Sequence, residues 1–178
     1  MTDRLAVSTL LASRVRDVPD WPQPGVMFKD ITPLLADHGA FAAAVDALVE
    51  QAGVGSVDKV VGIEARGFIL AAPVAYHLGA GFVPVRKAGK LPSATLSQDY
   101  ALEYGEATLE VHRDAFGPAD RVLVVDDVLA TGGTVAATAA LVRAAGAAVV
   151  GCSVLIELGF LGGRSRLDGL PVHSLLTY

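Results

Sequence analysis

Residues 122–134 have the sequence Val-Leu-Val-Val-Asp-Asp-Val-Leu-Ala-Thr-Gly-Gly-Thr. Four apolar residues end in two adjacent carboxylates, and a loop of small residues then leads into an alanine-rich segment with helical spacing. Such an apolar run is typical of a strand that is buried on both faces of a parallel sheet. The stretch therefore predicts a buried strand over 121–125, a ligand-facing turn and a helix over 135–145.

The predicted turn carries groups that suit a phosphorylated sugar. The backbone N–H groups of residues 131–134 are expected to be free at a helix N-terminus, beside two hydroxyls, and such a position binds phosphate. Asp126 and Asp127 would repel a phosphate, but they suit the vicinal hydroxyls of a sugar or a metal ion on the same ligand. A ribose 5-phosphate therefore fits this stretch better than a nucleoside triphosphate does.

Three other interpretations of residues 122–134 are weaker. A Walker-type loop requires a Lys after its last glycine, and none follows Gly132-Gly133. A dinucleotide-binding fingerprint requires three glycines in a G-x-G-x-x-G pattern directly after the strand, and that pattern is missing. A plain tight turn with two solvated aspartates is disfavoured, because two acids at the end of a buried strand need a partner.

Composition limits the class of protein. The 178 residues are 52% hydrophobic and 19% charged, which predicts one compact α/β domain. A net charge of −5, with no run of Lys or Arg longer than Arg86-Lys87, argues against nucleic acid as a partner. The single cysteine, Cys152, excludes an intrachain disulfide and is expected to be buried. The chain shows neither a cleavable signal pattern nor an apolar run long enough for a membrane span, so a cytoplasmic location without membrane contact is expected.

Along the chain, helical and strand-like segments alternate. We expect helices over 3–17, 41–52, 68–78 and 135–145, and strands over 59–63, 82–85, 108–112, 121–125, 148–156 and 172–176, with 108–112 resembling an edge strand. This alternation predicts a mainly parallel sheet with helices on both faces. The polar segment 88–106 has no core-forming stretch and is expected to be a functional flap.

Cations follow two of the predicted strands. Arg66 lies in the turn 64–67, and Arg86, Lys87 and Lys90 follow the next strand. Ligands of parallel sheets bind beyond the carboxyl ends of the strands, so these cations and the aspartate pair should meet there. The expected ligand therefore has a 5′-phosphate, a ribose and a second polyanionic group.

The stretch 122–134 resembles the 5-phosphoribosyl-1-pyrophosphate (PRPP) binding motif of the type I phosphoribosyltransferases. Further segments are similar, in the same order, to the branch of that family that uses adenine: 24–35, 66–68, 86–92, 102–105 and 157–158. Departures from the family pattern are mild. Glu64-Ala65 replaces a different acid and a Ser, and Lys29 stands where many relatives have Arg.

The resemblance implies one phosphoribosyltransferase domain over 1–178, with a small hood built from about 20–36 and 157–165 and a flexible flap over 88–106. It implies a purine-salvage enzyme that converts adenine and PRPP to AMP and pyrophosphate with Mg²⁺. It also implies a homodimer.

The resemblance assigns a role to each part of the site. Asp126 and Asp127 would hold the ribose hydroxyls, directly or through Mg²⁺ and water, with no dedicated protein cage for the metal. The 5′-phosphate would lie against Ala130, Thr131, Gly132, Gly133 and Thr134, and the pyrophosphate against Ala65, Arg66, Lys87 and Lys90. The base would contact Met27, Phe28, Lys29 and Leu158, and Glu103 on the flap would exchange the purine proton.

Two other functions are considered. A phosphoribosyltransferase for a 6-oxopurine or for orotate would share the PRPP motif and differ in its base. A PRPP-sensing regulator would need an added DNA-binding domain or a basic face, and the length and charge of this chain favour neither. The segment 162–164 is expected to be an ordinary surface loop.

Overall fold

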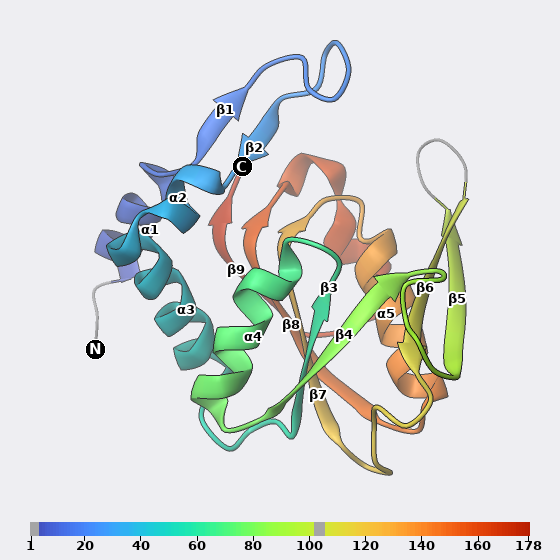
Figure 1. The fold of residues 1–178 in the computed structure, drawn as a ribbon. Coiled ribbons are helices and arrows are strands. Elements are labelled where there is room, and N and C mark those ends of the chain that lie inside the picture. Colours follow the sequence, from blue (N-terminus) through green and yellow to red (C-terminus); the bar gives the residue numbers. More distant parts are fainter. Residues whose placement is uncertain (1–3, 102–105) are drawn as a thin grey trace. The chain divides into compact units, whose positions relative to one another are not determined.

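The computed structural model describes residues 4–101 and 106–178 (Figure 1). The chain divides into two compact units, Met1–Ala47 and Leu48–Tyr178, and each is described by itself. Helix α3 (His38–Ala52) begins in the first unit and ends in the second.

The first unit contains a short antiparallel strand pair, β1 (Arg16–Val18) and β2 (Phe28–Asp30). Helix α1 (Arg4–Ala12) precedes it, and helix α2 (Thr32–Ala36) follows it. The expected helix over 3–17 was too long, because the chain leaves the helix to pair β1 with β2. Ion pairs Lys29–Asp17 (2.6 Å) and Arg16–Asp30 (3.4 Å) join the two strands.

Sequence reasoning did not predict helix α2. It begins at Thr32, two residues after Asp30, whose carboxylate accepts hydrogen bonds from the backbone N–H and the hydroxyl of Thr32, both at 2.9 Å. Pro33 occupies its first turn, where the missing N–H of proline costs nothing. The start of this short helix is therefore determined by side-chain hydrogen bonding and by proline, rather than by a periodic pattern of apolar residues.

The second unit is built on a seven-stranded sheet with the order β5-β6-β4-β3-β7-β8-β9. Its strands are β3 (Lys59–Ile63), β4 (Gly81–Lys87), β5 (Thr95–Ala101), β6 (Glu106–His112), β7 (Arg121–Leu129), β8 (Ala148–Glu157) and β9 (Val172–Thr177). The five strands from β4 to β9 are parallel, and β5 and β6 are antiparallel. The predicted mainly parallel sheet is confirmed.

One helix covers each face of this sheet (Figure 1). Helix α4 (Gly67–Leu78) packs on β3, β4 and β7, and a Cβ added at Gly62 of β3 would lie only 2.8 Å from Ala71 of this helix. Helix α5 (Gly133–Ala144) packs on the opposite side, where Leu141 and Ala137 join Val61 in a buried cluster. Two short 3₁₀ helices, η1 (Gly159–Leu161) and η2 (Gly163–Arg166), connect β8 to β9.

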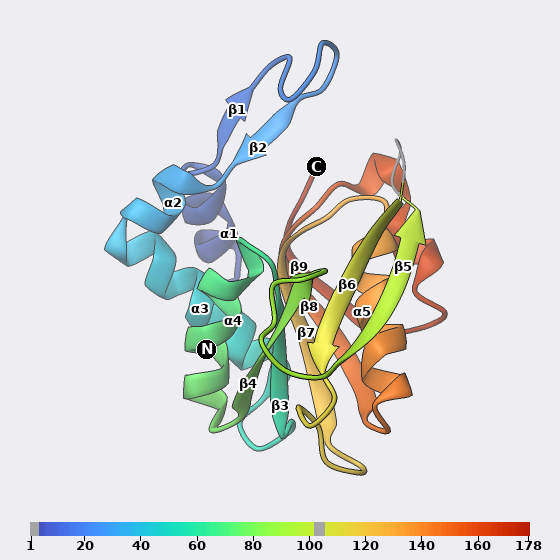
Figure 2. The ribbon, with the colours of Figure 1, turned by 45° about the vertical axis from the view of Figure 1, so that its right-hand side comes forward.

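The antiparallel strands differ from the sequence prediction. Segment 88–106, in which no core-forming stretch was expected, contains strand β5, which pairs with β6 along the whole of its length (Figure 2). Strand β6 was expected at the sheet edge, but it lies between β5 and β4. Leu96 and Tyr100 of β5 pack against the core cluster, so the alternate residues of this polar strand provide its apolar contacts.

The single cysteine lies inside the sheet, as predicted. Cys152 in β8 is fully buried, and burial together with the negative charge of Asp126 raises the pKa of its thiol to about 12. The thiol is therefore a small apolar core group rather than a nucleophile. Within 4–101 and 106–178, every helix is too short or too polar to cross a membrane.

Candidate active site

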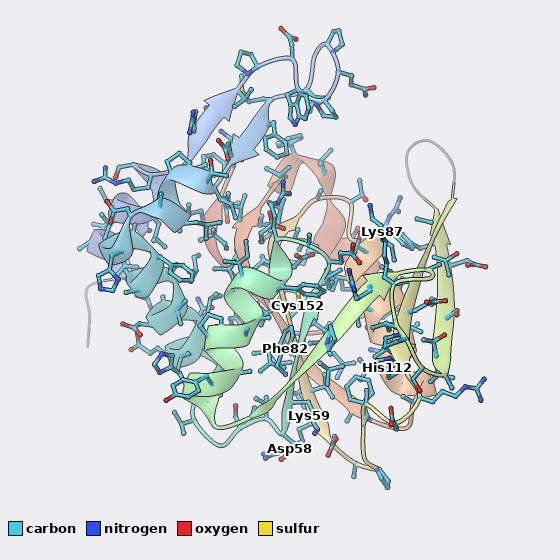
Figure 3. The ribbon with its side chains drawn as sticks, in the orientation of Figure 1. Asp58, Lys59, Phe82, Lys87, His112 and Cys152 are labelled. Atoms are coloured by element: carbon cyan, nitrogen blue, oxygen red, sulfur yellow. The ribbon has the colours of Figure 1, made fainter. Side chains whose placement is uncertain are left out.

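The predicted site residues of the second unit lie at the carboxyl edge of its parallel strands. The turn 64–67 follows β3, Lys87 ends β4, and Asp126 and Asp127 lie in the last part of β7. Figure 3 shows Lys87 at this end of the sheet and Asp58 and Lys59 at the other end. Three segments far apart in sequence are therefore brought to one edge, as the parallel topology predicted.

The two aspartates lie within strand β7 rather than after it. The strand was expected to end at Val125, but it continues to Leu129 because its last residues pair with Ile156 and Glu157 of β8. Asp126 and Asp127 are only 9% and 6% exposed. Burial, reinforced by the charge of Asp127, raises the pKa of Asp126 well above its usual value. Ionising both buried aspartates therefore requires a partner of opposite charge.

An arginine that follows the neighbouring strand β3 binds one of the two aspartates. Arg66 donates from Nε to Oδ2 of Asp127 at 2.5 Å, which is a short, charge-assisted hydrogen bond. The next residue, Gly67, lies so close to Asp126 that an added Cβ would be 2.6 Å from its Oδ1 atom. Glycine at this position therefore allows the first turn of α4 to approach the aspartates closely.

The N-terminus of α5 has the form expected of a phosphate site. Its N-cap residue, Gly132, has φ of +82°, a left-handed conformation that favours glycine, and no side chain caps the helix. The N–H groups of the first helical turn lack intrahelical acceptors, so they can face an anion. The loop Ala130–Gly132 joins this helix directly to the end of β7.

The cations after β4 have different environments. Arg86 donates to Glu64 Oε2 at 3.1 Å and to the carbonyl oxygen of Lys90 at 3.0 Å. Burial would raise the pKa of Glu64, but hydrogen bonds from the Lys87 N–H and from Arg86 outweigh it and lower that pKa. Arg86 and Glu64 therefore shape the loop, and the exposed side chains of Lys87 and Lys90 extend from it.

The predicted base-binding residues are in both units. Met27 is 48% exposed, Phe28 and Lys29 are half-buried in β2, and Lys29 Nζ donates to Asp17 at 2.6 Å. In the second unit, Leu158 follows β8 and its N–H donates to the carbonyl oxygen of Leu129 at 2.9 Å. The predicted proton-transfer residue, Glu103, lies outside the described residues.

Sequence reasoning missed a cluster beside the loop Ala130–Gly132, which precedes α5. The segment 162–164 was expected to be a plain surface loop, but Gly163 is buried against Ala130 and Gly132. Arg164 forms a two-pronged ion pair with Glu157 at the end of β8. The expected surface position holds for Gly162 and Arg164, which are exposed, but not for Gly163, because its burial depends on tertiary contacts. The adjacent glycines were the only local signal of close backbone packing.

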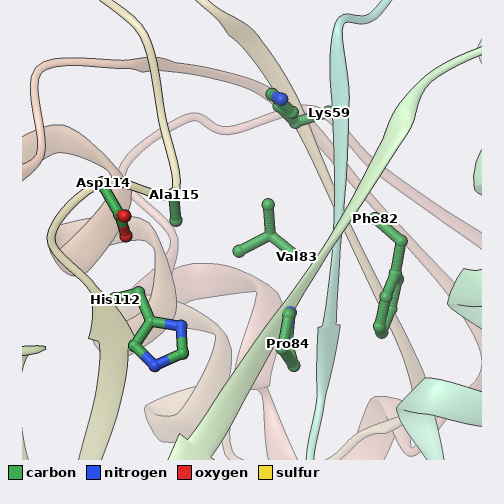
Figure 4. A pocket seen from close by; sticks show the side chains of 7 residues that line it. All are labelled: Lys59, Phe82, Val83, Pro84, His112, Asp114 and Ala115. Atoms are coloured by element: carbon green, nitrogen blue, oxygen red, sulfur yellow. The ribbon is translucent and has the colours of Figure 1, made fainter. Parts of the chain in front are cut away.

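Two further observations limit where the site can be. A cavity of about 200 Å³ is lined by Lys59, Phe82, Val83, Pro84, His112, Asp114 and Ala115, none of them a predicted site residue (Figure 4). In the described part of the chain, no group of three or more His, Cys, Asp or Glu side chains is placed to hold a metal ion. The carboxyl edge of the sheet is therefore the candidate active site.

Comparison with known proteins gives the class of this fold and site. Residues 34–167 match the phosphoribosyl transferase domain family. Because this match covers most of the 178 residues, the chain belongs to the phosphoribosyltransferase family.

The individual relatives define the branch of the family. The chain is 68% identical over 170 residues to adenine phosphoribosyltransferase of Acidothermus cellulolyticus, covering 96% of each chain. The crystal structure of the Rhodothermus marinus adenine phosphoribosyltransferase is 53% identical with a TM-score of 0.93, covering 98% of this chain and 99% of that one. The crystal structure of the Saccharomyces cerevisiae enzyme, complexed with adenine and an imino-altritol bisphosphate, is 37% identical with a TM-score of 0.91. It covers 96% of this chain and 99% of that one. Within the family, the chain thus groups with the adenine phosphoribosyltransferases.

Proposed function

We propose that this chain transfers the 5-phosphoribosyl group of PRPP to adenine in purine salvage, giving AMP and pyrophosphate. The observation that carries the proposal is the composition of one sheet edge. There, the adjacent strands β3 and β7 bring together an aspartate pair, an arginine bound to one of those aspartates and an uncapped helix N-terminus. The grouping with adenine phosphoribosyltransferases supports the choice of base.

PRPP has three parts, and each has a proposed subsite. The 5′-phosphate binds the loop and first helical turn formed by Ala130, Thr131, Gly132, Gly133 and Thr134. The ribose hydroxyls bind Asp126 and Asp127, whose carboxylates accept their hydrogen bonds. The pyrophosphate binds Arg66, the backbone around Ala65, and Lys87 and Lys90. This assignment puts the cations at the polyanionic end of the ligand, where electrostatic attraction is greatest.

The same arrangement suggests what PRPP must displace. Arg66 is bound to Asp127 in this structure, so the subsites for pyrophosphate and ribose share one ion pair. A pyrophosphate group would compete for the Arg66 guanidinium, and a ribose hydroxyl would replace it on Asp127. Binding of the two ends of PRPP should therefore be coupled.

We propose Mg²⁺ as the cofactor. Among the residues that the structure describes, the two adjacent carboxylates have no third acidic ligand beside them, which fits an ion that keeps most of its waters and binds mainly to substrate oxygens. When bound, Mg²⁺ would neutralise charge on the departing pyrophosphate. Asp126 and Asp127 would hold it through water or through the ribose hydroxyls.

The reaction is a substitution at the anomeric carbon of ribose. The bond from this carbon to the pyrophosphate oxygen breaks, and its electron pair leaves with pyrophosphate. A ring nitrogen of adenine donates its lone pair to the same carbon, which acquires oxocarbenium character as in glycoside cleavage. The proton on adenine then moves to Glu103. A flap over 88–106 would keep water from the reactive sugar.

Base recognition is assigned to four residues. The backbone groups of Met27 and Lys29 contact the polar edge of adenine, and Phe28 and Leu158 cover its ring faces. The side chain of Lys29 is held by Asp17, which is compatible with recognition through the backbone. We also propose, from the family resemblance, that the enzyme acts as a homodimer in the cytoplasm.

A direct assay tests the proposed function. Purified protein mixed with adenine, PRPP and MgCl₂ is expected to produce AMP and pyrophosphate, detected by mass and by a pyrophosphate-coupled assay. The reaction without added Mg²⁺ and with EDTA is expected to be much slower. If AMP does not form at any enzyme concentration, the proposal is wrong.

Replacing the flap acid tests the proton-transfer step. Glu103→Gln keeps the shape of the side chain but removes its basicity, so kcat is expected to fall by about tenfold or more, with a smaller change in KM for PRPP. Glu106→Gln, a nearby acid with no proposed role, is the matched control. A kcat for Glu103→Gln within about threefold of wild type would remove this residue from the mechanism.

A further inference from the structure

We propose that Arg164 and Glu157 form a brace that holds the 5′-phosphate loop in its binding shape, which makes Arg164 a positioning residue for PRPP. The proposal rests on the proposed function, because it assumes that Ala130–Thr134 bind the 5′-phosphate. It adds a residue that acts on the loop through its neighbour Gly163 rather than by touching the substrate.

The first step is the close approach of two backbone segments. A Cβ added at Gly163 would overlap the carbonyl oxygen of Ala130 and lie 2.9 Å from the backbone nitrogen of Gly132. A Cβ added at Gly132 would overlap the carbonyl oxygen of Gly163. Because no side chain can lie between these segments, any movement of Gly163 is transmitted directly to the loop that precedes α5.

The second step is the anchoring of Gly163 by its neighbour. The Arg164 guanidinium donates from Nε to Glu157 Oε1 at 2.9 Å and from Nη2 to Oε2 at 2.5 Å. Its Nη1 donates to the carbonyl oxygen of Val172 at 2.7 Å. One side chain thus ties the short helix η2 to the end of β8 and to the start of β9.

The third step concerns the other half of the brace. Glu157 is 8% exposed, and its Oε2 atom also accepts a hydrogen bond from the Ser174 hydroxyl at 2.9 Å. Hydrogen bonding from Arg164 is the largest influence on this carboxyl and lowers its pKa, so Glu157 remains ionised at neutral pH. A buried carboxylate that needs this partner holds the guanidinium in one geometry.

These contacts argue against Arg164 as a direct anion ligand. Three of its five N–H donors are already used by Glu157 and Val172. The side chain therefore acts on the position of Gly163 and, through Gly163, on the loop Ala130–Gly132. Removing it should weaken the binding of the phosphorylated sugar more than the binding of the base.

The test separates KM for PRPP from the other kinetic constants. Arg164→Gln is expected to raise KM for PRPP by about tenfold, with kcat and KM for adenine changed by less than about threefold. Arg164→Lys keeps the charge but loses the planar fork, so an intermediate rise is expected. Arg166→Gln is the matched control, since Arg166 lies on the same 3₁₀ helix and forms no ion pair within the described residues.

A double variant separates positioning from stability. Arg164→Gln alone leaves the Glu157 carboxylate buried without its partner and should lower the melting temperature. Adding Glu157→Gln removes that charge, so the melting temperature is expected to recover in part while KM for PRPP stays raised. A general structural role would instead restore both quantities together, and that result would overturn the proposal.

The remaining outcomes also decide the question. If wild-type protein makes no AMP, the proposed function fails, whatever the variants do. If wild-type protein is active and Arg164→Gln keeps the wild-type KM for PRPP, the function stands and the brace is wrong. If Arg164→Gln does not fold, Arg164→Lys decides: a raised KM for PRPP supports the brace, and an unchanged KM overturns it.

Discussion

Replacing Asp127 with Asn is expected to lower kcat/KM for PRPP by about 10²- to 10³-fold, equivalent to about 2.7–4 kcal/mol of transition-state stabilisation. Asp127 is 6% exposed and accepts a 2.5 Å hydrogen bond from Arg66. The substitution removes a charged acceptor for a ribose hydroxyl. The ribose of the bound PRPP should therefore lose its alignment with the attacking base. Steady-state kinetics with PRPP as the varied substrate measures the effect.

The neighbouring aspartate provides a matched comparison. Burial raises the pKa of Asp126, so its carboxyl ionises less readily than an exposed one. Asp126→Asn is therefore expected to lower kcat/KM for PRPP by a smaller factor than Asp127→Asn does. Asp114→Asn, at the cavity of Figure 4, is the control for loss of an acid remote from the site. If kcat/KM for PRPP of Asp127→Asn stays within about tenfold of the wild-type value, the ribose subsite is assigned wrongly.

The parallel sheet and its ligand edge were predictable because their signals are local. Apolar runs such as 122–125 need burial on both faces, and the glycines and small residues that follow mark where each strand gives way to a helix. The prediction of α5 was accurate to within about two residues at its start, as expected for helix ends. Because these strands are parallel, the loops that follow them lie at the same edge of the sheet, and this position could be predicted without knowing any tertiary contact.

Features that depend on pairing were not predictable. Asp126 and Asp127 would normally mark the end of a strand, yet the long strand β8 continues beside them and keeps β7 extended to Leu129. Strand β5 contains mostly polar residues, and it is held in the sheet by seven residue pairs with β6. No local pattern distinguishes such a strand from a loop, because its partner determines its structure.

Contacts made by the backbone alone were the hardest to foresee. The sequence shows Gly162-Gly163 as a typical loop, and only the folded chain brings Gly163 against Ala130 and Gly132. Glu157 ends strand β8 and Arg164 lies in the 3₁₀ helix η2, so no single helix or strand relates the two side chains. Residues that shape a site through other residues therefore become visible only when the fold is known.

The purine preference is expected to be the largest effect of all, with kcat/KM for adenine exceeding that for hypoxanthine by about 10⁴-fold. Adenine has a donor at its 6-amino group and an acceptor at N1, and hypoxanthine has the reverse pattern. A backbone carbonyl that accepts from the 6-amino group would face the 6-oxo oxygen of hypoxanthine, so two acceptors would be buried against each other without a proton between them. The backbone of Met27 and Lys29 is the proposed source of this discrimination.

A competition assay measures this preference under identical conditions. Adenine and hypoxanthine at equal concentration compete for limiting enzyme with saturating PRPP and Mg²⁺, and mass spectrometry separates AMP from IMP in the same sample. Since both products come from one PRPP pool, a defect in PRPP binding lowers both and leaves their ratio unchanged. We expect AMP almost exclusively. Comparable amounts of IMP would show that the base subsite does not discriminate at the 6-position, and would reassign the chain to another branch of the family while leaving the PRPP subsites intact.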